Sequence, residues 1–348
     1  MHIRALKYVT PLVVFALVVL SFTQTGWLTF LPVLYSFGII PLLELWLRPD
    51  ASNLDEASEE VIRRDPSYDY ILYGFVFLQW AALLYFLSSI GEFRSDPLTL
   101  VGRILTMGLL CGTFGINIGH ELGHRSSHWE QLLAKLSLLT SLYMHFFIEH
   151  NKGHHKNVAT HDDPGSARRG ESVYFFWTRA VIHCYRNAWQ IASREMRQKK
   201  RFVFSISNEM LQMQLIQAAL IVAVAAWQGW FVLLCFLFAA LIGILMLETV
   251  NYIEHYGLQR KSLGNGKFER PMPVHSWNSN HIMGRMMLFE LSRHSDHHYH
   301  ASRKYPLLRH HEEAPQMPTG YPGMMLLSLV PPLWFLVMHK KINEIVSC

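Results

Sequence analysis

The chain has 348 residues, of which 51% are hydrophobic and only 16% are charged. Such a low charged fraction is unusual for a soluble globular domain, so the composition favours a membrane protein. The formal net charge of +5 is small, and we attribute it to basic loops on one side of a membrane rather than to nucleic-acid binding.

Long apolar segments account for this composition. Each of six segments approaches or exceeds the roughly 20 residues that cross a bilayer as an α-helix. In chain order they are residues 8–25, 27–47, 69–91, 97–119, 210–227 and 229–250. A seventh apolar stretch, residues 131–150, is interrupted by Lys135 and His145, and we expect an interfacial or partly embedded helix there. The predicted fold is therefore an all-α polytopic membrane protein with six transmembrane helices in a single domain, residues 1–348.

Basic residues set the predicted orientation. Nearly all Lys and Arg fall on one side of the six spans, in Arg4, Lys7, residues 48–68, residues 120–209 and the segment after 251. Because cytoplasmic loops carry the excess of basic residues, this side is predicted to be cytoplasmic, together with both termini. The first apolar segment is followed by no small-residue cleavage site, so we expect it to remain as a helix.

Histidines gather at the predicted cytoplasmic ends of these spans. The nine that stand at ligand spacing are His120, His124, His150, His154, His155, His255, His294, His297 and His298. Residues four apart share a helix face, so His150 and His154 are expected to point the same way, with His155 about a quarter-turn away. Imidazole is the commonest metal-binding side chain, and nine imidazoles exceed what one ion takes. The sequence therefore predicts two metal ions.

Acidic residues stand beside these histidines. Neutral imidazoles leave the charge of two divalent ions uncompensated, so carboxylates should accept hydrogen bonds from the outer ring N–H groups. The residues that we expect to act in this way are Asp163, Glu121, Glu254 and Asp296, with Glu149 and Asp162 as further candidates. About half of these six are expected to be ordinary charged residues of the membrane interface.

Small residues near the predicted metal site allow two interpretations. Gly115, Gly119 and Gly123 form two overlapping GxxxG steps, which usually indicate close helix packing. Alternatively, Ser36, Gly38 and Gly115 line a substrate channel that leads to the metals.

Four histidine-containing motifs resemble the signatures of the bacterial membrane alkane 1-monooxygenases. They are residues 120–124 (HELGH), 149–155 (EHNKGHH), 251–257 (NYIEHYG) and 293–298 (RHSDHH). The similarity extends from about residue 30 to residue 325 and includes residues 278–281 (NSNH) and 318–323 (PTGYPG). This resemblance implies that the nine histidines hold two irons. It also implies a bacterial cytoplasmic membrane protein that uses O2 to hydroxylate the terminal methyl group of medium- or long-chain n-alkanes entering from the bilayer.

The resemblance also implies an electron-transfer partner. In this family NADH supplies electrons through a rubredoxin reductase and rubredoxin. The cysteines Cys111, Cys184, Cys235 and Cys348 form no Cys-x-x-Cys pair, so we expect rubredoxin to be a separate protein and not a domain of this chain. The basic run within residues 194–201 either contacts anionic lipid head groups or docks an acidic electron carrier.

Several residues depart from the family pattern and leave alternatives open. Ser292, Arg125 and His161 stand where the family usually has Gln, Lys and Pro, and the C-terminal part is similar to xylene monooxygenase. A hydroxylase of aromatic methyl groups and an enzyme acting on fatty-acyl chains are therefore alternatives. A histidine-rich metal transporter is disfavoured, because no path lined by carboxylates or histidines crosses the predicted spans.

Overall fold

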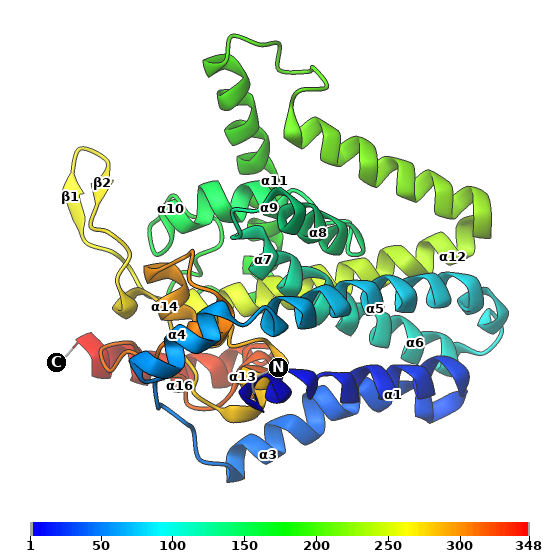
Figure 1. Ribbon diagram of the computed structural model, residues 1–348, viewed down its shortest axis with the longest axis horizontal. Coiled ribbons are helices and arrows are strands. Elements are labelled where there is room, and N and C mark those ends of the chain that lie inside the picture. The colour runs from blue at the N-terminus through cyan, green and yellow to red at the C-terminus, as the bar shows by residue number, and fades with distance from the viewer. Residues whose placement is uncertain (1–2, 347–348) are drawn as a thin grey trace.

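The computed structural model describes residues 3–346 as an almost entirely helical protein (Figure 1). The ends of the predicted domain, residues 1–2 and 347–348, and with them Cys348, lie outside the described residues. The α-helices are α1 (Leu12–Thr23), α2 (Leu31–Leu34), α3 (Ile40–Trp46), α4 (Glu56–Arg64), α5 (Ser67–Ser89), α6 (Pro97–Leu110), α7 (Asn117–Gly123), α8 (His128–Leu139), α9 (Phe146–Glu149), α10 (His155–Asn157), α11 (Val173–Gln198), α12 (Glu209–His255), α13 (Ile282–Met287), α14 (His294–Tyr299), α15 (Tyr321–Ser328) and α16 (Pro331–Val346).

Shorter elements join these helices. The 3-10 turns are η1 (Ile3–Val9), η2 (Gly26–Phe30), η4 (Ile90–Phe93), η7 (Pro273–His275) and η8 (Tyr305–Leu307). Wider π-helical turns occur at η3 (Tyr35–Ile39), η5 (Cys111–Ile116) and η6 (His150–His154). The strands β1 (Ser262–Gly264) and β2 (Lys267–Phe268) pair as a small antiparallel hairpin.

Among the described residues, five helical stretches are long and apolar enough to cross a membrane. They are Arg4–Thr23, Gly26–Trp46, Ser67–Phe93, Pro97–Gly123 and Glu209–His255. The first four coincide with the first four predicted spans. Large apolar side chains on their outer faces are exposed, such as Phe77 at 67% and Val222 at 66%, as expected for surfaces in contact with lipid.

The fifth stretch, α12, consists of two helices. Its 47 residues exceed by far the roughly 20 that one crossing needs, and the helix breaks at Gly229, where φ is 80° and ψ is 173°. Glycine adopts a positive φ without a steric penalty, so the chain reverses there, as the sharp bend of α12 in Figure 1 shows. The two limbs, residues 209–228 and 230–255, match the last two predicted spans. The total of six spans and the cytoplasmic orientation stay predictions.

The predicted continuous helix over residues 131–150 is wrong. Helix α8 ends at Leu139, Leu142 has a φ of 51°, and a new helix begins only at Phe146. The intervening turn packs against η5, where the hydroxyl of Ser141 donates to the carbonyl of Cys111 at 3.0 Å. A π-helical turn leaves backbone carbonyls without their usual donors. The hydroxyl of Ser141 supplies a donor to one of these carbonyls.

Two apolar clusters fix the end of the bundle that carries the histidines. In one, Phe75 stacks on Phe114 at a ring distance of 5.3 Å, which holds α5 against η5 just before α7. In the other, the fully buried Trp334 of α16 packs on Tyr252 and Tyr256 at the end of α12. The C-terminal helices therefore brace the end of α12 from which His255 projects.

Candidate metal centre

The nine predicted histidines come together where α7, the turn η6, the end of α12 and α14 meet. The structure places them in two groups. One contains His120, His124, His150, His155 and His297, and the other contains His154, His255, His294 and His298. Within each group, one nitrogen of every ring lies within 4.8 Å of those of the other rings. Two compact sets of imidazoles are therefore available for two ions.

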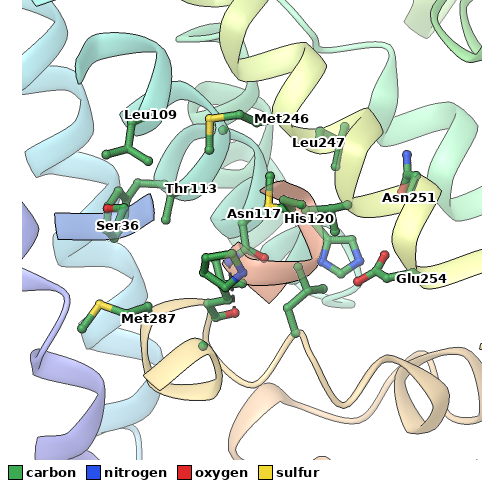
Figure 2. A pocket seen from close by; sticks show the side chains of 18 of the residues that line it. Ser36, Leu109, Thr113, Asn117, His120, Met246, Leu247, Asn251, Glu254 and Met287 are labelled. Atoms are coloured by element: carbon green, nitrogen blue, oxygen red, sulfur yellow. Dashed lines mark hydrogen bonds between the residues drawn. The ribbon is translucent and has the colours of Figure 1, made fainter. Parts of the chain in front are cut away.

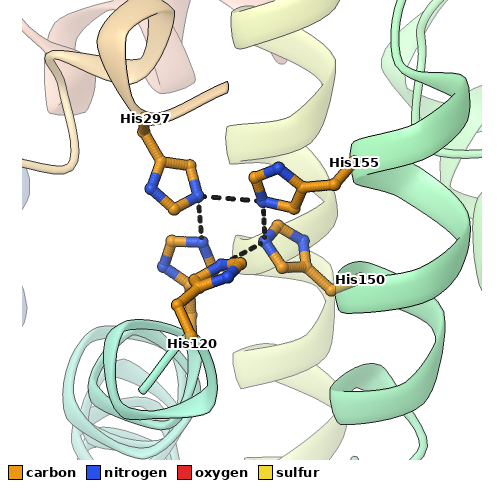
Figure 3. Close-up of side chains that lie close together, drawn as sticks. His120, His150, His155 and His297 are labelled. Atoms are coloured by element: carbon orange, nitrogen blue, oxygen red, sulfur yellow. Dashed lines mark hydrogen bonds between the residues drawn. The ribbon is translucent and has the colours of Figure 1, made fainter. Parts of the chain in front are cut away.

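Ligand geometry explains the distances within the larger group (Figure 3). The Nε2 atoms of His120 and His297 lie 2.9 Å apart, those of His155 and His297 3.1 Å, and those of His150 lie 3.0 Å from His155 and 3.1 Å from His124. Two ligands at right angles, each about 2.1 Å from a metal, are separated by about 3.0 Å.

Hydrogen bonds alone do not account for these contacts. A neutral imidazole nitrogen either donates one hydrogen or accepts one. The Nε2 atoms of His150 and His297 each approach two neighbours, so at most two of the four contacts in this group are hydrogen bonds. A cation to which all the lone pairs point satisfies every ring at once, so the donor set fits a metal.

The π-helical turn η6 determines how its histidines divide. In an α-helix His150 and His154 would share a face, as the spacing predicts. Because η6 widens the turn by one residue, His150 instead faces His155, and both belong to the five-histidine group. His154 points to the other group, where its Nε2 lies 3.2 Å from that of His298. The prediction that His150 and His154 point the same way is wrong for this reason.

Burial keeps most of these rings neutral. It lowers the pKa well below the usual value for His124, His150, His155, His294, His297 and His298. Neighbouring imidazoles lower the pKa further, because two cationic rings repel one another. The nitrogen lone pairs therefore stay available to a metal at neutral pH.

Asp163 holds one ring from its outer side. The Nδ1 atom of His154 lies 2.9 Å from Oδ2 of Asp163, which also accepts from the hydroxyl of Ser166 at 2.6 Å. Burial alone raises the pKa of Asp163, but His154 and Ser166 lower it more, so the carboxylate stays ionised. With the Nδ1 proton of His154 donated to Asp163, the Nε2 lone pair is directed to the four-histidine group.

The other predicted carboxylates do not contact an outer ring nitrogen. Glu121 accepts from Arg125 at 2.7 Å and from the backbone of Tyr305. Asp296 is bound by Arg303, by His311 and by the backbone of Arg309. Both side chains are thus engaged by cations that fix nearby loops, and sequence adjacency to a histidine did not determine where they point.

Three further acidic residues differ among themselves. Glu149 is buried and accepts from Asn187 at 3.0 Å, whereas Asp162 is exposed beside His161. Glu254 is buried on the ligating side of the rings, where its Oε2 lies 3.2 Å from Nε2 of His294. Its other oxygen accepts from the hydroxyl of Tyr321 at 2.8 Å. The structure therefore contradicts the predicted outer position of Glu254.

An apolar cavity runs from the metal centre into the bundle (Figure 2). Its lining includes His120, His150, His294 and Glu254 at the metal end. Figure 2 shows Ser36 and Leu109 on the side away from Glu254. Most of the remaining wall is apolar, and it includes Thr113, Asn117, Met246, Leu247, Val250, Asn251, Met287, Leu288 and Leu291.

The three predicted channel residues have different positions. Ser36 lines the cavity. Gly38 does not line it, and a Cβ atom added at Gly38 would meet nothing within 4 Å. A Cβ atom added at Gly115 would lie 2.6 Å from Oγ of Ser141, so this glycine serves close packing of η5 and not a channel.

Two buried amides line the cavity and were not predicted from the sequence as functional residues. Asn117 stands one helical turn before His120, and Asn251 one turn before His255. Their helical spacing from ligands was the signal that could have identified them.

The basic run of residues 194–201 lies at the end of α11, which Figure 1 shows far from α14. Within that run Glu195 pairs with Lys152 of η6 at 2.7 Å, so the run begins beside the turn that carries His150 and His154, and its role stays a prediction.

Comparisons with known proteins agree with this geometry. A family model described as fatty acid desaturase matches residues 97–328, the part of the chain that contains all nine histidines. Alkane 1-monooxygenase 2 of Alcanivorax borkumensis is 39% identical over 332 residues, which cover 93% of this chain and 85% of that protein. Alkane 1-monooxygenase of Pseudomonas putida is 37% identical over 321 residues, covering 92% of this chain and 80% of that protein.

The chain belongs to the alkane 1-monooxygenase family. A more distant relative is the hydroxylase component of xylene/toluene monooxygenase from Pseudomonas putida, which is 30% identical over 250 residues. That match covers 71% of this chain and 65% of the relative. The lower identity and shorter match separate it from the alkane relatives. Membership of this family, together with the five apolar stretches, makes the chain a membrane protein with a metal centre.

Proposed function

We propose that this chain hydroxylates the terminal methyl group of medium- or long-chain n-alkanes. The reaction is R–CH3 + O2 + 2 e⁻ + 2 H⁺ → R–CH2OH + H2O. The observation that carries this proposal is the apolar cavity whose metal end includes three of the nine clustered imidazoles, His120, His150 and His294. A chain end that reaches this wall stands next to both histidine groups.

Iron is the metal that we propose for both groups. The donor set is rich in imidazole and has carboxylates nearby, which suits iron, copper, zinc and nickel, and the proposed reduction of O2 excludes the redox-inactive zinc. When bound, two irons would supply the activation of O2 and the oxidation of the C–H bond. The protein contributes the neutral ligand set, the outer hydrogen bond that His154 donates to Asp163, and a mostly apolar cavity.

Packing alone orients the substrate. An alkane forms no hydrogen bond, and the cavity wall offers mostly aliphatic carbon and thioether groups such as Leu247, Met246 and Met287. An alkane that leaves the bilayer exchanges one apolar surrounding for another, so it gains little of the roughly 0.8 kcal/mol per CH2 that transfer from water provides. Affinity and chain-length preference therefore depend on how closely the walls contact the chain.

A second apolar cavity supports access of the alkane from the membrane. Its lining shares Phe37, Leu109, Met246 and Met325 with the first cavity. It continues past Leu105, Ile242 and Leu245 to the partly exposed Leu326 and Leu329. The shared side chains thus stand between the bilayer and the metal end. Flexible methionines at two of these four positions can change rotamer to admit a chain.

We also propose the electron donor and the location. Rubredoxin would deliver one electron at a time from an NADH-dependent rubredoxin reductase, and the chain would lie in the bacterial cytoplasmic membrane. The metal centre would face the cytoplasm, because the basic segments 48–68 and 120–209 lie on the same side of the predicted spans as the histidines.

Alkane turnover tests the proposal. Membranes containing the chain receive octane or dodecane with NADH, rubredoxin and its reductase, and mass spectrometry identifies the products. We expect a 1-alkanol that requires every component and disappears in His297→Ala, which also loses iron. An alcohol formed only from xylene or toluene would transfer the assignment to aromatic methyl groups, and an alkene would indicate a desaturase.

A matched pair of variants tests the membrane route. Leu245→Trp fills the second cavity, whereas Leu241→Trp places the same ring on a 47% exposed position of the same helix. We expect slower dodecane turnover only in Leu245→Trp, with iron content unchanged in both. Equal rates in the two variants would exclude this route.

A further inference from the structure

Glu254 occupies the position of a ligand, not of an outer partner. The Nε2 atom of His294 has three close neighbours: Nε2 of His298 at 2.9 Å, Nε2 of His255 at 3.2 Å and Oε2 of Glu254 at 3.2 Å. The carboxylate oxygen therefore stands to His294 as the neighbouring imidazoles do. All three separations are close to the roughly 3.0 Å expected between ligands at right angles.

Two lone-pair atoms do not face one another at this distance without a proton or a cation between them. A proton on Nε2 of His294 or on Oε2 of Glu254 would occupy the lone pair of that ring nitrogen and withdraw the ring from its metal site. A metal ion supplies the charge and keeps His294, His298 and His255 as ligands. The geometry thus distinguishes Glu254 from Asp163, which contacts the outer nitrogen of its ring.

The burial of Glu254 leads to the same conclusion. Its side chain is 1% exposed, and its only other polar contact among the described residues is the hydroxyl of Tyr321. No Lys or Arg of the described part of the chain forms an ion pair with it. An ionised carboxylate without a cation is costly to bury, whereas a divalent ion at the adjacent imidazoles offsets that cost.

We propose that Glu254 is the fifth ligand of the four-histidine group, an inference that rests on the proposed function. One metal then has five imidazoles, and the other has four imidazoles and a carboxylate. The anionic oxygen stabilises the higher oxidation state of its own metal, so the two irons differ in potential. Because Glu254 also lines the cavity, the carboxylate-bound metal is adjacent to the substrate end.

Spectroscopy of protein loaded with ⁵⁷Fe tests this ligand. Unaltered protein should hold two irons with two distinct Mössbauer doublets of equal area. In Glu254→Gln only one doublet should change, and a chelator should remove that iron about tenfold faster or more. The control is Glu248→Gln, because Glu248 is equally buried but is bound by Tyr143 and Asn251 and contacts no ligating ring. Both of its doublets should stay in place.

A second measurement needs no variant. Reduction of the irons should shift a carboxylate stretching band in redox-difference infrared spectra, and ¹³C-glutamate labelling should move that band. Unchanged doublets in Glu254→Gln, or no glutamate band in the difference spectrum, would overturn the assignment of Glu254. Unaltered protein that binds no iron would overturn the proposed function instead, so the two failures are distinguishable.

Discussion

Replacing Asp163 by Asn tests how an outer hydrogen bond controls metal binding. The Asp163 carboxylate accepts from His154 at 2.9 Å, from Ser166 at 2.6 Å and from the backbone N–H of Gly165 at 3.0 Å. An amide can keep the bond from Gly165 through its oxygen, but its NH2 group then faces the Nδ1–H group of His154. To avoid two opposed donors, His154 must move its proton to Nε2, and that removes the lone pair on which the metal depends.

The expected loss of metal affinity follows from the role of a carboxylate that holds the outer nitrogen of a ligating histidine. Removal of an outer partner of a ligating histidine typically costs 10- to 100-fold in metal affinity, or about 1.4–2.8 kcal/mol. We expect a loss in this range for one of the two irons, because His154 belongs only to the four-histidine group. Turnover should fall with the occupancy of that group.

Chelator competition is the assay, with iron per chain measured at each chelator concentration. The matched control is Asp162→Asn, which changes the neighbouring carboxylate, whose side chain is 61% exposed. That variant should titrate as the unaltered protein does. If Asp163→Asn retained both irons as firmly as Asp162→Asn, the assignment of Asp163 to the tautomer of His154 would be refuted.

Three further outcomes follow from the packing and the cavity. Ser36→Phe should weaken binding of the longest alkanes by about 1–3 kcal/mol and leave binding of the shortest alkanes unchanged, measured as product yield against chain length. The control Gly38→Phe should leave the yield unchanged at every chain length, because Gly38 is outside the cavity. Gly115→Ala should lower the thermal midpoint, since its Cβ would lie 2.6 Å from Ser141, whereas Gly74→Ala, with no atom within 4 Å, should raise stability by up to about 1 kcal/mol. Removing iron with a chelator should lower the thermal midpoint, because a bound metal stabilises the folded state by about 2.7 kcal/mol when iron is 100 times its Kd. Added Fe²⁺ should restore the midpoint. An unchanged midpoint would mean that the nine imidazoles are held without a metal.

Hydropathy was a reliable guide to the fold where segments face lipid. The break between the last two predicted spans coincides with Gly229, because a lipid-exposed helix pair must reverse at a residue that tolerates a positive φ. Residues 131–150 were harder to predict, because the turn at Leu142 depends on contacts with η5, a segment that precedes it by some 30 positions. Periodicity carries no information about such long-range packing.

Spacing identified which histidines assemble but not how they divide. His294 and His298 share a group as their i, i+4 relation suggests, since α14 is an ordinary α-helix. His150 and His154 do not, because a π-helical turn cannot be read from ligand spacing. The carboxylates were the least predictable, since Asp296 and Glu254 both adjoin a histidine in sequence and differ entirely in the direction of their side chains.

The two histidine groups join parts of the chain that are synthesised far apart in time. His120 and His297 are separated by 177 positions, yet their nitrogens lie 2.9 Å apart. Neither group is complete until α14 has left the ribosome, because each needs at least one of its histidines. A metal ion at either group therefore has its full set of histidine ligands only after α12, the last of the five long apolar stretches, has been synthesised.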